Sequence, residues 1–572
     1  MGDQDPGMST GCGHPVKRTS SVLAAALVLL AWCAGSSGAQ EAAPVDLTIL
    51  AINDFHGNLR PPPSGIRIAD PNDKTKKIAV PAGGAEHLAT LVKELRAGRK
   101  NSIFVAAGDS IGASPFLSAL SLDEAAVQSL SLMGLDLSAV GNHEFDKGKD
   151  ELLRMQNGGC SPTKGCRGPQ PFSGAKFRYL AASTFERSTG QTLFPPYAVK
   201  EFDGIPVAFI GLTLKGTPDM VTPAGVAGLT FGDEAETINA LVPQIRARGI
   251  EAIVVLIHEG GFPTGDYNEC PALGGPIVGI VHKLDKAVDL VVSGHTHRAY
   301  VCEIDGRLVT SADQYGTLVT QIDLKLDPKT RDVISAKANN LIVRTDTYAK
   351  DPDQTALIAA YDLSVKPLAE RKVGSITATL SRSPNAAGES PLGAIVADAQ
   401  LSATRQDEDG GALIAFTNPG GVRNDIVKRA EDGAVTYADL FAAQPFSNSL
   451  VTVTLTGAQI KELLEQQWAI LPNTPRILQV SKGFSFAWDS TRPAGDHVLA
   501  DSITLNGQPI DPAASYRVTV NSFLASGGDG FAVLNKATAA RTGGPDLDAL
   551  VTYFQANSPL SPGEPGRVRR AN

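Results

Sequence analysis

The sequence predicts an α/β protein with two domains, a layered α/β domain followed by an α+β domain. The chain has 572 residues, and at about 100–200 residues per domain this length indicates more than one domain. In the first half, short apolar runs rich in Val and Ile alternate with helical patterns, which is typical of a layered α/β domain. After Lys372 the pattern changes to strands such as Leu450–Leu455, in which apolar and polar residues alternate, followed by helical segments.

Five apolar runs of the first half are expected to be buried strands, because each is short and ends at turn residues. These runs are Leu47–Ile52, Ile103–Ala107, Val207–Gly211, Ala252–Ile257 and Leu290–Ser293. Helices are expected at Glu86–Ala97, Glu124–Met133 and Glu234–Arg248, and Asp233 with Glu236 resembles a capping box before the last of these. Pro352–Glu370 is expected to form one connecting helix. In the second half we expect a helix from Gly457 through Trp468 and strands at Ser502–Leu505 and Tyr516–Val520.

Composition narrows the class of function. The chain carries 60 acidic and 51 basic residues, a formal net charge of −9, which argues against broad electrostatic binding to a nucleic acid polymer or an anionic membrane. Apolar residues make up 42% and charged residues 19%, a globular composition that excludes disorder for most of the chain.

The N-terminus has the pattern of a secretory signal peptide over residues 1–39. Lys17 and Arg18 precede the apolar run Val22–Ala34, and Ser37-Gly38-Ala39 offers small residues for cleavage after Ala39. A buried N-terminal helix is the alternative. Trp32 before Cys33 argues against a lipoprotein. No later stretch is long and apolar enough to span a membrane, so we expect a secreted, periplasmic or cell-envelope protein.

Four cysteines remain after cleavage, and an even number in an exported chain favours disulfides. Cys160 with Cys166 would close a short loop, and Cys270 with Cys302 a longer one. A zinc site is the alternative, but these spacings do not match a zinc ribbon or finger.

Polar clusters follow the predicted strands at the point where each strand ends. They are Asn53-Asp54-Phe55-His56-Gly57, Gly108-Asp109-Ser110, Gly141-Asn142-His143-Glu144, His258-Glu259 and Gly294-His295-Thr296-His297. Five of the nine histidines lie in these clusters, and parallel strands would bring all of the clusters to one edge. Carboxylate, amide and imidazole ligands together suit Zn²⁺, Mn²⁺ or Fe²⁺. Two such ions about 3.5–4 Å apart, with a hydroxide between them, are a device that cleaves phosphoesters.

These five clusters, in this order, resemble the calcineurin-like metallophosphoesterases, and Asn-Asp-Phe-His-Gly with Gly-Asn-His-Glu-Phe-Asp resembles the exported 5′-nucleotidase family. The resemblance covers essentially the whole mature chain. It implies a four-layer metallophosphoesterase sandwich at residues 45–343, a linker helix at 344–372 and a C-terminal α+β nucleotidase domain at 373–565. It also implies two divalent metal ions. Asp54, His56, Asp109 and His297 would hold one ion, and Asp109, Asn142, His258 and His295 the other. His143 would stabilise the transition state, oriented by Asp146, for which a helix cap is the alternative role.

Three later segments fit a nucleotide pocket: Asn418–Arg423, Gln444–Asn448 and Asn521–Gly530. Two Phe rings can sandwich a base, an Asp suits two neighbouring ribose hydroxyls, and an Arg suits phosphate. The resemblance assigns this pocket to Asn418, Arg423, Phe446, Phe523 and Asp529. The chain departs from the family at Gly388, where the family often has an Arg; Arg382 and Asn385 are candidate substitutes.

The expected activity is therefore removal of phosphate from nucleoside 5′-monophosphates by attack of a metal-bridging hydroxide. Alternatives of the same class are hydrolysis of UDP-sugars, of nucleoside di- or triphosphates, or of 2′,3′-cyclic nucleotides with 3′-nucleotidase action. An alternative of another class is a catalytically silent, secreted nucleotide-binding protein.

Overall fold

The computed structural model describes residues 43–572 except 222–224, 447 and 469–474. The expected signal peptide, residues 1–39, lies outside the described residues. Within these residues, no helix combines the length and the apolar character that crossing a membrane requires.

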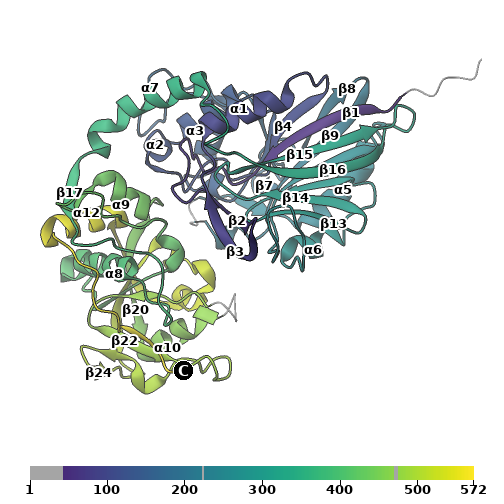
Figure 1. Ribbon diagram of the computed structural model, residues 1–572. Coiled ribbons are helices and arrows are strands. Elements are labelled where there is room, and N and C mark those ends of the chain that lie inside the picture. The colour runs from purple at the N-terminus through teal and green to yellow at the C-terminus, as the bar shows by residue number, and fades with distance from the viewer. Residues whose placement is uncertain (1–42, 222–224, 447, 469–474) are drawn as a thin grey trace, which may run out of the picture. The chain divides into compact units, whose positions relative to one another are not determined.

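Two six-stranded sheets form the N-terminal half (Figure 1). The first sheet has, in order across it, β16 (Val333–Ile342), β15 (Leu318–Leu326), β1 (Val45–Ile52), β4 (Ser102–Ala106), β5 (Leu137–Ala139) and β6 (Arg178–Leu180). The second has β13 (Ala299–Ile304), β14 (Arg307–Ala312), β12 (Leu290–Ser293), β11 (Ala252–His258), β9 (Ile205–Thr213) and β8 (Tyr197–Phe202). β1, β4, β5 and β6 are parallel, and so are β9, β11, β12 and β14. Each run of parallel strands therefore ends at one edge.

The two sheets pack face to face through one apolar cluster, to which β1 contributes Leu47 and Ile49 and β11 contributes Val254 and Leu256. Strands buried on both faces explain the nearly continuous apolar runs in the sequence. Helices α1 (Ala85–Arg96) and α3 (Glu124–Leu132) cover the outer face of the first sheet. Helices α5 (Glu234–Arg246) and α6 (Pro276–Val281) cover the outer face of the second sheet. This is the predicted four-layer sandwich.

The helix α5 shows why the local sequence folds in this way. Its buried residues Ala235, Ile238, Val242 and Ile245 recur every three or four positions and form one apolar stripe. Asp233 caps the helix by accepting a hydrogen bond from the backbone N–H of Glu236. The expected helix is confirmed, and it ends at Arg246 rather than Arg248.

Shorter elements surround the sandwich. They are the hairpin β2 (Ile66–Asp70) and β3 (Asp73–Val80), the pair β7 (Thr184–Glu186) and β10 (Leu229–Phe231), and helices α2 (Phe116–Leu120) and α4 (Lys149–Asn157). The sequence reasoning did not identify the hairpin.

Helix α7 (Pro352–Ala369) confirms the expected connecting helix. Asp351 caps it, and Ile358 and Tyr361 are buried in the cluster that also holds α1 and α3. The boundaries 45–343, 344–372 and 373–565 stay a prediction.

The C-terminal half is a mixture of sheets and helices, as expected for an α+β domain. A five-stranded sheet has the order β21 (Gln479–Val480), β18 (Ile414–Thr417), β25 (Ser515–Asn521), β20 (Ser449–Thr456) and β26 (Thr538–Pro545). A four-stranded sheet has the order β24 (Gln508–Pro509), β23 (Thr504–Leu505), β22 (Phe484–Trp488) and β27 (Val568–Arg570), and β17 (Lys372–Ser375) pairs with β19 (Ala434–Thr436). The helices are α8 (Pro391–Thr404), α9 (Tyr437–Ala443), α10 (Gly457–Glu465), α11 (Ser522–Ala525) and α12 (Asp546–Asn557).

Two expected elements differ in the structure. The expected strand Ser502–Leu505 is a 3-10 turn at Ala500–Ser502 followed by the two-residue strand β23. The expected helix from Gly457 through Trp468 is α-helical only to Glu465 and continues as a 3-10 turn.

Candidate functional site

Seven side chains of the predicted metal centre stand at strand ends, as the sequence indicated. Asp54 and His56 follow β1, Asp109 follows β4, Asn142 follows β5, His258 ends β11, and His295 and His297 follow β12. Five of the seven have a positive backbone φ, namely Asp54, His56, Asp109, His295 and His297. That conformation costs about 1–2 kcal/mol per non-glycine residue, and such strain gathers at functional sites.

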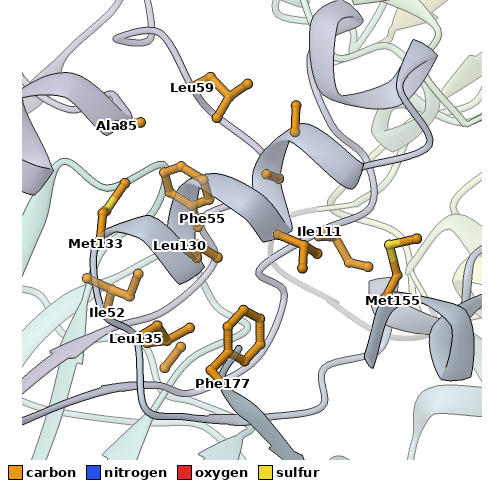
Figure 2. Packing of buried hydrophobic residues seen from close by; sticks show 14 of the residues in the cluster. Ile52, Phe55, Leu59, Ala85, Ile111, Leu130, Met133, Leu135, Met155 and Phe177 are labelled. Carbon is orange, nitrogen blue, oxygen red and sulfur yellow. The ribbon is translucent and has the colours of Figure 1, made fainter. Parts of the chain in front are cut away.

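Buried apolar side chains anchor the loops that carry these residues. Phe55 lies between Asp54 and His56 and is 1% exposed, and Ile111 follows Asp109 by two positions. Both belong to the cluster formed with α1 and α3, and Figure 2 shows them among Leu130 and other members of it. Phe55 thus anchors the loop in the core, while its neighbours Asp54 and His56 both reach one candidate cation site.

The first candidate cation site contains Asp54, His56 and His297, whose ligand atoms lie within 4.8 Å of one another. His297 Nε2 is 3.2 Å from His56 Nε2 and 3.2 Å from Asp54 Oδ1. Asp54 Oδ1 is buried and has no hydrogen-bond partner among the residues that the structure describes. Two imidazole nitrogens facing each other beside an unpartnered carboxylate oxygen fit a cation bound between them.

The second candidate cation site contains Asp109, His258 and His295. His258 Nε2 is 2.9 Å from Asp109 Oδ2. The amide oxygen Asn142 Oδ1 is 3.2 Å from His258 Nε2 and 3.1 Å from His295 Nδ1. The donor set is therefore one carboxylate, one amide oxygen and two imidazoles.

Asp109 connects the two sites. Its Oδ2 atom is 2.9 Å from His258 Nε2 in the second site and 3.6 Å from His56 Nε2 in the first. Its Oδ1 atom accepts a hydrogen bond of 2.9 Å from the backbone N–H of His143. One carboxylate oxygen thus faces both sites, which is the arrangement that a bridging ligand requires.

Backbone carbonyls orient two of the imidazoles. His56 Nδ1 is 2.8 Å from Gly112 O, and His258 Nδ1 is 2.8 Å from Ala107 O. Donation from Nδ1 leaves Nε2 of each ring free to bind a cation.

Burial and neighbouring charges shift the pKa values of the site. Burial lowers the pKa of His56 to about 3 and that of His295 to about 4, so both rings are neutral and able to bind metal. Burial alone would raise the pKa of Asp54 and Asp109, but the adjacent histidines outweigh it and lower both values. Both carboxylates are ionised.

His143 stands beside the metal cluster and is held by Asp146. Its Nδ1 donates to Asp146 Oδ2 at 2.9 Å, and its ring centroid is 5.1 Å from that of His56. Burial alone would lower its pKa, but the Asp146 and Asp109 carboxylates raise it to about 9. Asp146 follows the 3-10 turn His143–Phe145, whereas the N-cap of the next helix, α4, is Gly148. The orienting role of Asp146 stays a prediction.

Glu144 and Tyr315 are site residues that sequence reasoning missed. Glu144 accepts hydrogen bonds from the backbone N–H groups of Asp109, Ser110, Ile111 and Gly141. Tyr315 places its ring edge-on to those of His56 and His297, at 5.9 Å from each. Glu144 belongs to the cluster Gly141–Glu144, which was a usable signal in the sequence, whereas no sequence pattern marked Tyr315.

The predicted pocket residues of the C-terminal half form two groups. Asn418 Nδ2 donates to Asp529 Oδ2 at 2.8 Å, and the ring of Phe523 lies against Gly528, where an added Cβ would meet ring atoms at 2.6 Å. The Arg423 guanidinium lies over the ring of Phe446 at 5.5 Å. The Phe446 ring in turn stacks on His143 at 5.9 Å, with 21° between the planes. Among the described residues, no ring contact joins Phe446 to Phe523.

The position of Gly388 excludes a side chain. Its φ is +91°, and an added Cβ would lie 2.6 Å from Cβ of Ile477. Asn385 is not a free substitute, because its side-chain oxygen accepts from the N–H groups of Ala387 and Glu389. Arg382 lies closer to the pocket sequence, with Nη1 3.4 Å from Val422 O.

Both expected disulfides are present, Cys160–Cys166 and Cys270–Cys302. The second ties the loop that follows His258 to β13, whose Cys302 is 2% exposed.

Comparison with known proteins agrees with this geometry. Residues 47–299 match the calcineurin-like phosphoesterase family, and residues 371–536 match the C-terminal domain of 5′-nucleotidases. Endonuclease YhcR of Bacillus subtilis is 31% identical over 533 residues, which are 92% of this chain but only 41% of that protein. Cell wall protein Lmo0130 of Listeria monocytogenes is 32% identical over 578 residues, 94% of this chain and 71% of that protein.

A solved structure of a similar protein has the same fold. The 5′-nucleotidase precursor of Thermus thermophilus aligns with a TM-score of 0.73 at 27% identity, over 92% of this chain and 99% of that one. The resemblance drawn from the sequence is thereby confirmed. The chain belongs to the 5′-nucleotidase family, which joins a calcineurin-like metallophosphoesterase domain to a 5′-nucleotidase C-terminal domain.

Proposed function

We propose that the chain is an exported dimetal phosphohydrolase that removes the phosphate of nucleoside 5′-monophosphates. The observation that carries this proposal is the position of Asp109 Oδ2, 2.9 Å from His258 Nε2 and 3.6 Å from His56 Nε2. A carboxylate oxygen between two ligand sets holds two cations close together, which is the requirement for cleaving a phosphoester with a pair of ions.

Each cation has four protein ligands in this proposal. Asp54, His56, Asp109 and His297 would hold the first, and Asp109, Asn142, His258 and His295 would hold the second. Mixed oxygen and nitrogen ligands without thiolate suit Zn²⁺, Mn²⁺ or Fe²⁺. When bound, the cations would polarise the phosphoryl oxygens and lower the pKa of water.

His143 and Asp146 act on the phosphoryl group. The Asp146 carboxylate accepts from Nδ1 of His143 at 2.9 Å, which orients the ring and leaves Nε2 to donate a hydrogen bond to a phosphoryl oxygen. Donors fixed in advance where charge develops are worth about 3–4 kcal/mol each.

The nucleoside binds to the C-terminal half. Asn418, Arg423, Phe446, Phe523 and Asp529 supply an amide, a guanidinium, two aromatic faces and a carboxylate, which together suit a phosphorylated sugar joined to a flat base. The stacking of Phe446 on His143 supports a substrate that reaches from this pocket to the cations.

The test measures phosphate release from AMP with Mn²⁺, Zn²⁺ or Co²⁺ and with EDTA. His143→Ala should lower kcat about 100–1000-fold. The matched control is His282→Ala, because His282 is exposed and pairs only with Asp305 among the described groups that contact its ring. Nucleotide binding without phosphate release from any substrate would favour the catalytically silent alternative.

The preferred substrate is decided by a panel that adds ADP, UDP-glucose, 2′,3′-cyclic AMP and a short oligonucleotide. The lack of space for a side chain at Gly388 makes this panel necessary, since the arginine that the family often has at this position would not fit there. If at least one other substrate of the panel has a higher kcat/KM than AMP, that substrate's class replaces the 5′-monophosphate assignment. Export is tested separately, by sequencing the N-terminus of the protein recovered outside the cytoplasm, with cleavage expected after Ala39.

A further inference from the structure

Asp529 is the centre of a polar network in the C-terminal half that includes one residue outside the predicted pocket. Its Oδ2 accepts from Asn418 Nδ2 at 2.8 Å, and Asn521 Nδ2 donates to Asn418 Oδ1 at 3.0 Å. Its Oδ1 pairs with the guanidinium of Arg476. Asp529 itself has a positive φ of 57°, a conformation that non-glycine residues rarely adopt.

Arg476 is held in place from its backbone. Its N–H donates to Gln467 O at 3.0 Å, and the side-chain oxygen of Gln467 accepts from the N–H of Leu478. Ile477, the next residue, is 4% exposed and fills the space over Gly388. These contacts therefore fix the backbone position from which the side chain of Arg476 reaches Asp529. Position 388, which Ile477 covers, carries no side chain.

Among the described residues, two side chains use the hydrogen-bonding capacity of the Asp529 carboxylate. A carboxylate offers about four lone-pair positions, and Asn418 and Arg476 take one each. With respect to the described residues two positions remain, which is the number that two neighbouring sugar hydroxyls need. The pair is open to a ligand, because the side chain of Arg476 is 38% exposed and that of Asp529 is 13% exposed.

We propose that Arg476 is a specificity-determining residue that selects nucleotides whose sugar carries both hydroxyls. Its guanidinium orients the Asp529 carboxylate toward those hydroxyls and donates a further hydrogen bond to a sugar oxygen. A guanidinium has five N–H donors in a rigid fork, so pairing with Asp529 leaves others for the sugar. This inference rests on the proposed function.

The test compares AMP with 2′,3′-dideoxyadenosine 5′-monophosphate in the metal-loaded enzyme. Arg476→Ala should raise KM for AMP about 10–100-fold, as expected for loss of hydrogen bonds to a charged group, and leave KM for the dideoxynucleotide and kcat for both within about threefold. Arg476→Lys keeps the positive charge but lacks the forked N–H donors, so its KM for AMP should lie between those of the unaltered enzyme and Arg476→Ala. Arg492→Ala is the matched control, because Arg492 forms an exposed pair with Asp496 in the same half.

Two outcomes overturn the inference. The first is an equal rise in KM for both nucleotides, which would mean a general loss of pocket structure. The second is a lower KM for AMP in Arg476→Ala, which would mean that the arginine competes with the sugar for Asp529.

A binding measurement separates this inference from the proposed function. Calorimetry with adenosine and 2′,3′-dideoxyadenosine needs no turnover, and adenosine should lose affinity in Arg476→Ala while the dideoxynucleoside does not. If the unaltered enzyme releases no phosphate from AMP but shows this difference, the proposed function fails and the Arg476 assignment stands.

Discussion

Replacing Glu144 should weaken metal binding even though Glu144 is not a proposed ligand. Its carboxylate joins the loop that carries Asp109 to the one that carries Asn142. Oε2 accepts from the N–H groups of Asp109 at 2.9 Å and Gly141 at 2.6 Å, and Oε1 from those of Ser110 at 2.8 Å and Ile111 at 3.3 Å. Burial and the Asp109 charge raise the pKa of Glu144 to about 8, whereas the N–H donors favour its ionised form, as bound cations would.

The size of the effect follows from these four bonds. A buried donor left without a partner costs about 1–3 kcal/mol. In Glu144→Ala, water can enter the vacated space, so the lower figure applies and the total is about 4 kcal/mol. Glu144→Gln keeps one acceptor oxygen and should lose about half of that. Outer contacts of this kind change metal affinity about 10–100-fold, and we expect that loss in Glu144→Gln.

The assay titrates metal-free protein with Zn²⁺ or Mn²⁺ and measures thermal unfolding in parallel. Glu389→Gln is the matched control, because Glu389 is also buried and accepts backbone N–H bonds, from Gly566 and Val568, but in the C-terminal half. The control should lose stability and keep its metal affinity. If Glu144→Gln binds metal as tightly as the unaltered protein, the role assigned to this carboxylate is wrong.

Three further predictions concern the carboxylate that orients His143, a disulfide and a buried acid. Asp146→Asn should lower kcat about 10–100-fold, less than His143→Ala, and an unchanged kcat would contradict the orienting role. Cys302→Ser should lose about 4 kcal/mol of unfolding free energy, because Cys270–Cys302 closes a separation of 32 residues; reductant should then destabilise the unaltered protein more than the variant, which keeps only Cys160–Cys166. Burial raises the pKa of Asp546 to about 7, so the folded state holds its proton and stability should fall as pH rises from about 4 to 7, by at most about 4 kcal/mol. Asp546→Asn in metal-free protein should flatten that slope, and an unaltered slope would refute it.

Much of the fold could be predicted because the spacing of apolar residues that marks a strand or a helix is visible within a short stretch of sequence. The runs around Leu47–Ile52 and Ala252–Ile257 were recognised as buried strands since both faces are apolar. The hairpin β2–β3 was missed because its strands carry several exposed charged residues and the apolar alternation covers only Ile66 with Ile68 and Ile78 with Val80. The strand expected at Ser502–Leu505 was wrong in its first half, where Ser502 instead ends a 3-10 turn.

The candidate site divides in the same way. The residues after β1, β4, β5, β11 and β12 could be named from the chain alone, because the end of a parallel strand is a local feature that also faces a shared edge. Distances across that edge depend on how two sheets pack, and only the folded chain brings Asp109 Oδ2 within reach of both His56 and His258. The contact of Arg476 with Asp529, 53 residues apart, has the same origin. The candidate ligands could thus be named from the order of residues. The position of Asp109 between the two candidate cation sites, and the contact of Arg476 with Asp529, arise from long-range packing that no local pattern encodes.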